Sequence, residues 1–262
     1  TNAPNWCPGQ PLPNHGGWQL APSQTSLATL PEQWRCTTHM ADPTAFNPAM
    51  TEATTPLIVC GTDTNVGKTV VSALLVQGLV ATYWKPIQSG LEEDGGDRNR
   101  VCRLLNLPAE RWHPEVYNLQ AAVSPHWAAE QENCYINPDQ LVLPDVSGPV
   151  VIETAGGLMV PLNRQWLQLD QLERWQLPLI LVARSGLGTL NHTLLSLEAL
   201  RLRNLKVLGL VLNGPPHPDN PKTLEQFGGV PVIAQLPHLP NLTAATLAEQ
   251  WHLQDLSLTF KR

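Results

Sequence analysis

The feature that most constrains the fold is a short apolar run that leads through a glycine-bounded loop into a helical segment. The run L-I-V-C at residues 57–60 predicts a buried strand, and Gly61 ends it. Residues 69–82 have the length of a helix and carry apolar side chains at helical spacing. A strand, a tight loop and a helix in this order predict a β-α unit in which the loop lies at the carboxyl end of the strand.

Further apolar runs continue this pattern along the chain. Helical stretches, notably residues 97–105 and 190–203, lie between several strand candidates, which are residues 83–87, 150–153, 177–183, 207–212 and 230–234. Continuous apolar strands that alternate with helices indicate an α/β fold with a mostly parallel sheet and helices on both faces. Ligands of such sheets bind outside the carboxyl ends of the strands, so we expect the functional residues there.

The loop after the first strand, G-T-D-T-N-V-G-K-T at residues 61–69, has the composition of a phosphate-binding loop. Its backbone N–H groups would cradle phosphates, Lys68 would add a cation, and the Thr69 hydroxyl would reach Mg²⁺. The spacing departs from the standard motif, because Gly61 lies one residue early and Thr62 occupies the first-glycine position. We therefore expect a fold of the phosphate-loop NTPase type; the alternative is a chance G-K-T at a helix start.

Charged residues beside later strands add to this loop. Lys85 opens K-P-I-Q-S-G and could share the charge of a transferred phosphoryl group, although a lysine alone is as readily a surface residue. Glu153 ends an apolar strand and precedes T-A-G-G, a setting that suits a hydrated Mg²⁺ with oxygen ligands. Asp97 is a second candidate ligand, with a helix N-cap as the alternative.

Charge and cysteine content limit the kinds of partner and the cellular compartment that we expect. The chain has 16 basic against 22 acidic residues, a net charge of -6, so we expect neither nucleic acid nor an anionic membrane as a partner. No apolar run approaches the roughly 18 residues that cross a bilayer, and no signal peptide is apparent. The five cysteines include no C-x-x-C pair, which fits a reducing compartment. We expect a soluble cytoplasmic protein.

The first 50 residues differ from the rest. They contain eight prolines and three tryptophans but a single basic residue, Arg35, and no sustained periodicity. We expect residues 1–50 to be a Pro-rich irregular leader that is disordered or foreign to the native protein, and residues 51–262 to form a single α/β domain. The alternative is that the tryptophans dock on that domain.

Six motifs together resemble the dethiobiotin synthetase family in order and spacing, over about residues 57–242. They are G-T-D-T-N-V-G-K-T, K-P-I-Q-S-G, S-P-H, E-T-A-G-G, L-G-T-L-N-H and V-L-N-G. The resemblance implies that ATP, CO₂ and 7,8-diaminononanoate give dethiobiotin, ADP and phosphate. One substrate amine forms a carbamate, the carbamate takes the γ-phosphoryl group, and the second amine closes the ureido ring by displacing phosphate.

The resemblance also implies roles for residues at matching positions. Asn213 would bind the adenine of ATP. The phosphate loop would bind ATP through Thr64, Asn65, Val66, Gly67, Lys68 and Thr69. Mg²⁺ would be held by Thr69, Asp97 and Glu153. Lys85, Lys68 and Thr64 would be catalytic. Lys85 and Ser89 would contact the carbamate and the diamine, with Ser124, Pro125 and His126 nearby. The substrate carboxylate would bind a partner subunit's Gly188, Thr189, Leu190 and Asn191, so a homodimer is implied.

Two positions depart from the family pattern, and two other functions stay open. Asn65 stands where many members have Glu, and Thr154 replaces the glycine of E-G-A-G-G. An amidoligase of the cobyrinic-acid type is one alternative; it would need a glutamine-hydrolysing domain or partner, and none follows before residue 262. A non-catalytic ATP switch that resembles chromosome-partitioning ATPases is the other; the negative charge and K-P-I-Q-S-G disfavour it.

Overall fold

A computed structural model describes residues 55–91, 95–145 and 147–260. The expected leader, residues 1–50, lies outside the described residues. Within the described ranges, no helix combines the length and the apolar character that a membrane crossing requires.

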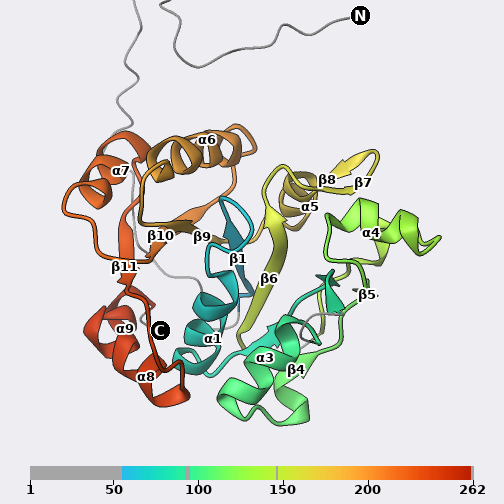
Figure 1. Cartoon of the computed structure of the whole chain (residues 1–262), viewed down its shortest axis with the longest axis horizontal. Coiled ribbons are helices and arrows are strands. Elements are labelled where there is room, and N and C mark those ends of the chain that lie inside the picture. The colour runs from blue at the N-terminus through green and yellow to red at the C-terminus, as the bar shows by residue number, and fades with distance from the viewer. Residues whose placement is uncertain (1–54, 92–94, 146, 261–262) are drawn as a thin grey trace, which may run out of the picture. The chain divides into compact units, whose positions relative to one another are not determined.

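Seven parallel strands form the central sheet in the order β11-β10-β9-β1-β6-β2-β4 (Figure 1). They are β1 Leu57–Gly61, β2 Thr82–Trp84, β4 Trp112–His113, β6 Val150–Gly157, β9 Leu179–Arg184, β10 Val207–Asn213 and β11 Val232–Leu236. Two short pairs lie outside it, β3 Ile87–Gln88 with β5 Tyr117–Asn118 and the antiparallel β7 Pro161–Asn163 with β8 Trp166–Leu167. The expectation of a mostly parallel α/β sheet is confirmed.

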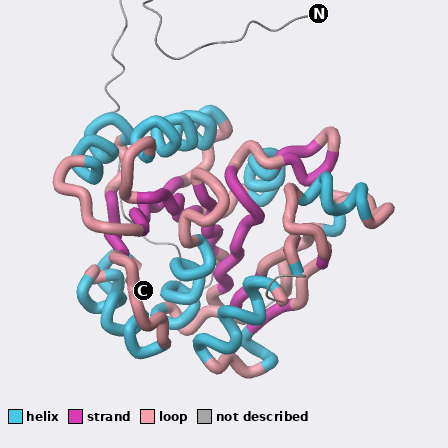
Figure 2. The backbone as a smooth tube through the Cα atoms, viewed as in Figure 1, coloured by secondary structure: helices cyan, strands magenta, loops and turns pink. Residues whose placement is uncertain are grey.

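Helices cover both faces of the sheet, as the tube view shows most simply (Figure 2). They are α1 Lys68–Gly78, α3 Gly96–Leu105, α4 Pro125–Gln131, α5 Gln168–Trp175, α6 Thr189–Leu202, α7 Asn220–Gly228, α8 Ala244–Leu253 and α9 Leu256–Thr259, with 3-10 turns η3 Ala109–Arg111 and η4 Pro138–Gln140. One apolar core joins α1, α3, α8 and α9 to the sheet, and a second joins α5, α6 and α7 to the opposite face. The two cores account for the continuous apolar strands, because both faces of the central strands β1, β6 and β9 are buried.

Most expected elements are shifted by one or two residues, and three of them differ from the sequence expectation in a way that affects the site. The helix expected at 69–82 is α1, which ends at Gly78 because Val80 takes a left-handed φ of 54° and turns the chain toward β2. The strand expected at 83–87 is divided into β2 and β3 around Lys85 and Pro86, since proline cannot donate to a strand ladder. β6 continues to Gly157, so Glu153 lies inside this strand rather than at its end.

One of the two edges of the sheet, β11, is closed by side chains rather than by another strand. The amide of Gln254 accepts from the Gln235 N–H at 3.1 Å and donates to the Gln235 carbonyl at 3.1 Å. A carboxylate oxygen of Glu225 accepts from the Val232 N–H at 2.9 Å. These bonds occupy backbone groups that an edge strand otherwise leaves open.

Burial makes one cysteine of the fold unreactive. Cys60 in β1 is fully buried, and desolvation raises the pKa of its thiol to about 12 despite the nearby Lys68. Roughly one thiol in ten thousand is then ionised at pH 8, and the thiolate is the reactive form. In native protein at pH 8 we expect iodoacetamide to modify the half-buried Cys134 and to leave Cys60 free, as measured by peptide mass spectrometry.

Unfolding in guanidinium is the control for this test, because it removes the burial and should make Cys60 react. Equal native rates at Cys60 and Cys134 would contradict the buried position of β1.

Candidate active site

The phosphate loop joins β1 to α1 at the middle of the sheet. Lys68 begins α1, and its ammonium donates to the Asp63 carbonyl at 2.9 Å, back across the loop. The Asp63 carboxylate accepts from the Thr64 N–H at 2.7 Å, which turns the loop tightly. Thr64 and Asn65 are exposed, and Val66 is buried in the core. Of the residues expected to bind ATP, Thr64 and Asn65 therefore lie on the open side of the loop, whereas Val66 and Lys68 are buried.

Asn213, the residue expected to read adenine, packs directly against this loop. It ends β10, and its side-chain N–H donates to the Val66 carbonyl at 3.1 Å. A Cβ on Gly67 would lie 1.6 Å from the Asn213 Nδ2, and Gly67 has a φ of +94°. Only glycine fits there without displacing Asn213. The asparagine amide keeps a second N–H and an oxygen for other partners.

Four side chains from separate segments meet beyond the loop, and we call Thr69, Lys85, Asp97 and Glu153 the carboxylate cluster. The Lys85 ammonium donates to an Asp97 oxygen at 2.5 Å and to the Glu153 Oε1 at 3.0 Å. The Thr69 hydroxyl donates to the same Glu153 oxygen at 2.9 Å. Glu153 reaches this place from within β6, because its side chain points to the face of the sheet that α1 covers.

The two lysines of the site experience different surroundings. Burial and the charge of Lys85 lower the pKa of Lys68, against the smaller effect of Glu153. Burial opposes the charged form of Lys85 as well, but Glu153 and Asp97 outweigh it and raise its pKa. Burial likewise opposes ionisation of Asp97, yet the Lys85 charge and hydrogen bond lower its pKa. The ion pairs thus hold Lys85 and Asp97 in their charged forms near neutral pH.

The oxygen atoms of the cluster suit a hard divalent cation. Two carboxylates already converge on one cation, the Lys85 ammonium, and the Thr69 hydroxyl bonds one of them. Mg²⁺ prefers such oxygen ligands together with water. Among the described residues, no group of three or more His, Cys, Asp or Glu side chains could hold a metal by itself. The donor set therefore fits a partly hydrated ion better than a site built from protein ligands alone.

Other expected substrate residues lie in two further places. Ser89 follows β3, and Ser124 precedes α4, whose first turn holds Pro125 and His126. The start of α6 lies beyond β9: Gly188 and Asn191 are exposed and Leu190 is half-buried. The Thr189 side chain is buried, with its hydroxyl 3.2 Å from that of Thr193. No hydrogen bond joins the start of α6 to the carboxylate cluster within the described ranges.

Three residues at the site were missed from sequence. The Tyr83 hydroxyl donates to the Glu153 Oε2 at 3.0 Å, and the Gln88 Oε1 accepts from the Asp97 N–H at 2.9 Å. Arg184 donates to the Asp63 carboxylate at 3.3 Å and to the Thr64 carbonyl at 3.2 Å. Arg184 ends β9, so its place at a strand carboxyl end was the signal that could have found it. Tyr83 sits in an apolar strand and gave no such signal.

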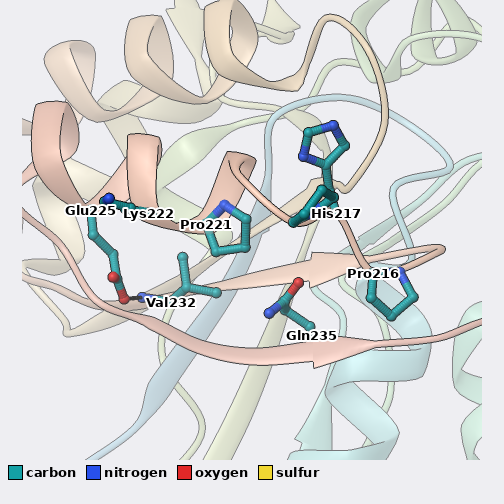
Figure 3. A pocket seen from close by; sticks show the side chains of 8 residues that line it. Pro216, His217, Pro221, Lys222, Glu225, Val232 and Gln235 are labelled. Carbon is teal, nitrogen blue, oxygen red and sulfur yellow. Dashed lines mark hydrogen bonds between the residues drawn. The ribbon is translucent and has the colours of Figure 1, made fainter.

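A separate open cavity of about 660 Å³ lies between α7 and β11, beside the loop that follows Asn213. Figure 3 shows Lys222, Pro221 and Glu225 on α7 facing Val232 and Gln235 on β11, with Pro216 and His217 from the loop. None of the residues expected at the active site lines it.

A parallel α/β sheet with a G-K-T loop between β1 and α1 defines a phosphate-loop NTPase. A family model described as an AAA domain matches residues 55–246. The ATP-dependent dethiobiotin synthetase of Rhodopseudomonas palustris (strain BisB5) is 49% identical over 194 residues, covering 74% of this chain and 91% of that protein. The synthetase of Paramagnetospirillum magneticum is 52% identical over 192 residues, covering 73% and 92%. The chain belongs to the ATP-dependent dethiobiotin synthetase family.

Two further proteins are similar to this chain over part of their length or in fold. A biotin biosynthesis bifunctional protein of Bordetella avium (strain 197N) is 50% identical over 198 residues, and the match spans 76% of this chain but 42% of that protein. Among solved structures, a ParA family ATPase from Chlorobium tepidum TLS is similar at a TM-score of 0.47 and 11% identity, over 77% of this chain and 98% of that chain. The structural likeness concerns the fold alone.

The close contact of Gly67 with Asn213 predicts a specific defect. We expect Gly67→Ala to weaken nucleotide binding at least tenfold, because the added methyl displaces Asn213 as well as straining the backbone by about 1–3 kcal/mol. Titration with a fluorescent ADP analogue measures the affinity.

Gly148→Ala is the matched control, since Gly148 also has a positive φ, of +132°, but no atom within 4 Å of the added carbon. Equal nucleotide affinities in the two variants would show that the contact with Asn213 does not shape the site.

Proposed function

We propose that this chain is an ATP-dependent cyclo-ligase that makes dethiobiotin from 7,8-diaminononanoate and CO₂ in biotin biosynthesis. The observation that carries the proposal is the meeting of buried Lys85 with two carboxylates beside a phosphate loop that holds buried Lys68, in a member of this family. The amidoligase and ATP-switch alternatives are not favoured, because the curated relatives are named dethiobiotin synthetases.

The reaction needs no side-chain nucleophile. One amine of the substrate adds to CO₂ and loses a proton, which gives a carbamate. A carbamate oxygen attacks the γ-phosphorus of ATP and ADP leaves, which gives a carbamic-phosphoric anhydride. The second amine then attacks the carbonyl carbon, phosphate leaves with the bonding electrons, a proton is lost, and the ureido ring is closed. The chain must bring two anions together and keep water from the anhydride.

Lys68 and Lys85 would supply the positive charge that brings the anionic carbamate and the anionic γ-phosphate together. Lys68, with the backbone N–H groups of Thr64, Asn65, Val66 and Gly67, would hold the β- and γ-phosphates. Lys85 would lie between the carbamate and the γ-phosphoryl group, where fixed cations stabilise charge that spreads in the transition state. Asn213 would bind the adenine edge with the part of its amide that the loop does not use.

Thr69, Asp97 and Glu153 would hold Mg²⁺ with the nucleotide. When bound, the ion would neutralise negative charge on the phosphate oxygens. Two carboxylates would then share one divalent cation, which relieves their mutual repulsion as the Lys85 ammonium does here. Asn65, where many relatives have Glu, leaves the loop without a further carboxylate.

The diamine would extend from Lys85 and Ser89 toward a second subunit. Its carboxylate would meet the N-terminal end of α6, residues 188–191, contributed by the partner of a homodimer, since a helix N-terminus favours an anion. We place the enzyme in the cytoplasm and take residues 51–262 as one catalytic domain, a range that contains the family match at 55–246.

Substrate-dependent turnover tests the proposed function. With ATP, Mg²⁺ and bicarbonate, we expect ADP release only when 7,8-diaminononanoate is added, together with a product of the mass of dethiobiotin. Coupled ADP detection and mass spectrometry measure both. ATP turnover that ignores the diamine would contradict a ligase.

Lys68→Ala should lower this turnover by about 10² or more, because a preorganised positive group at the phosphates is lost. Lys222→Ala is the control, since Lys222 is an exposed lysine on α7 and lies outside the proposed site. Equal losses in both variants would argue against a specific role for Lys68.

A further inference from the structure

Two buried polar side chains lie behind the carboxylates of the cluster, and no motif assigns them a role. Tyr83 is fully buried and Gln88 is 6% exposed. Each makes a hydrogen bond to one of the two acidic residues, Tyr83 to the Glu153 side chain and Gln88 to the Asp97 backbone. Both come from the segment around Lys85, which therefore contacts the two acidic residues through three side chains.

Tyr83 determines which way the Glu153 carboxylate is turned. Its hydroxyl donates to Oε2 at 3.0 Å, while Thr69 and Lys85 both donate to Oε1, at 2.9 and 3.0 Å. The two oxygens are thus distinguished by their partners, and Oε1 is held toward the phosphate loop. Without the hydroxyl, Oε2 would lack this donor and the carboxylate could rotate about its last bond.

Gln88 supplies a hydrogen-bond acceptor that the N-cap of α3 lacks. An acidic residue at the start of a helix often accepts from the open N–H groups of the first turn. In α3 the N-cap is Gly95, which has no side chain for this bond, and the Gln88 Oε1 accepts from the Asp97 N–H instead. The Asp97 carboxylate makes ion pairs with Lys85 at one oxygen and with Arg100, at 3.6 Å, at the other.

The surroundings of Gln88 keep it in that place. Its Nε2 donates to the Ser89 carbonyl at 2.6 Å. The helix start closes around the side chain, since a Cβ on Gly96 would lie 3.2 Å from the Gln88 Cγ and Gly96 has a φ of +85°. One amide therefore connects the Ser89 segment to the start of α3.

We propose that Tyr83 and Gln88 are positioning residues that fix Glu153 and Asp97 for the metal–nucleotide complex, and so set metal affinity. This inference rests on the proposed function, which places the metal at these carboxylates. Partners behind metal ligands commonly change metal affinity or activity by 10–100-fold when they are removed. A role in packing alone would lower stability and leave metal affinity as it is.

The test is Mn²⁺ binding in the presence of ADP, followed by the loss of the free-ion signal in electron paramagnetic resonance. We expect Tyr83→Phe and Gln88→Met each to weaken Mn²⁺ binding by about tenfold. ADP affinity in EDTA should change less than twofold, because the phosphate loop is untouched. Thermal unfolding reports the stability cost separately.

Two matched controls remove the same groups elsewhere. Tyr117→Phe deletes a mostly buried hydroxyl that bonds Gln140 and the Asn137 N–H, away from the carboxylates. Gln254→Met deletes an amide that, like Gln88, accepts from one backbone N–H and donates to one carbonyl. We expect both to lower the melting temperature and to leave Mn²⁺ affinity unchanged.

The outcomes separate this inference from the proposed function. Wild-type protein that takes up no Mn²⁺ with ADP would overturn both. Wild-type uptake with unchanged affinity in Tyr83→Phe and Gln88→Met would overturn the positioning roles alone, as would equal losses in the two controls. If Gln88→Met does not fold, Gln88→Leu replaces it, and Tyr83→Phe still decides the Glu153 half.

Discussion

The site depends on one electrostatic constraint: charges taken out of water need opposite charges at bonding distance. The Lys85 side chain is 6% exposed and that of Glu153 1%, and removing one member of such a pair typically costs about 3–5 kcal/mol. The compensating groups come from separate chain segments, and the sheet order brings them together. β6 lies between β1 and β2, so Glu153 has Thr69 beyond one neighbour and Lys85 beyond the other. The cluster can therefore form only when the sheet does.

Lys68, unlike Lys85, is a buried lysine without a carboxylate partner among the described residues. It is as deeply buried as Lys85, but its ammonium donates to a backbone carbonyl, and no ion pair to a carboxylate occurs for it within the described ranges. Its pKa is lowered while that of Lys85 is raised, which reflects this difference in contacts. A bound phosphate would supply the negative charge that Lys68 lacks in the protein alone. Lys68 should therefore bind an anion more strongly than a lysine that is already paired with carboxylates.

Much of this could be predicted from sequence, because the signals were local. The loop at residues 61–69 and the parallel sheet follow from short patterns, and the chemistry expected of Lys85 and Glu153 follows from neighbouring strands. Glu153 was placed at a strand end because the apolar run stops there and the small residues T-A-G-G follow, yet pairing with β1 keeps that segment extended to Gly157. Tyr83 could not be found, since its bond joins residues 70 positions apart and a tyrosine is ordinary in an apolar strand. Gln88 lies within K-P-I-Q-S-G, but nothing in that motif indicates its bond to Asp97.

The closed edge of β11 has a consequence for how copies of this protein can associate. Gln254 and Glu225 occupy the backbone groups through which a neighbouring chain would add a strand. A continuous sheet running through two molecules would first have to break these bonds and expel both side chains. Association through the β11 edge is thus disfavoured at the level of the main chain, and two molecules would meet through other surfaces.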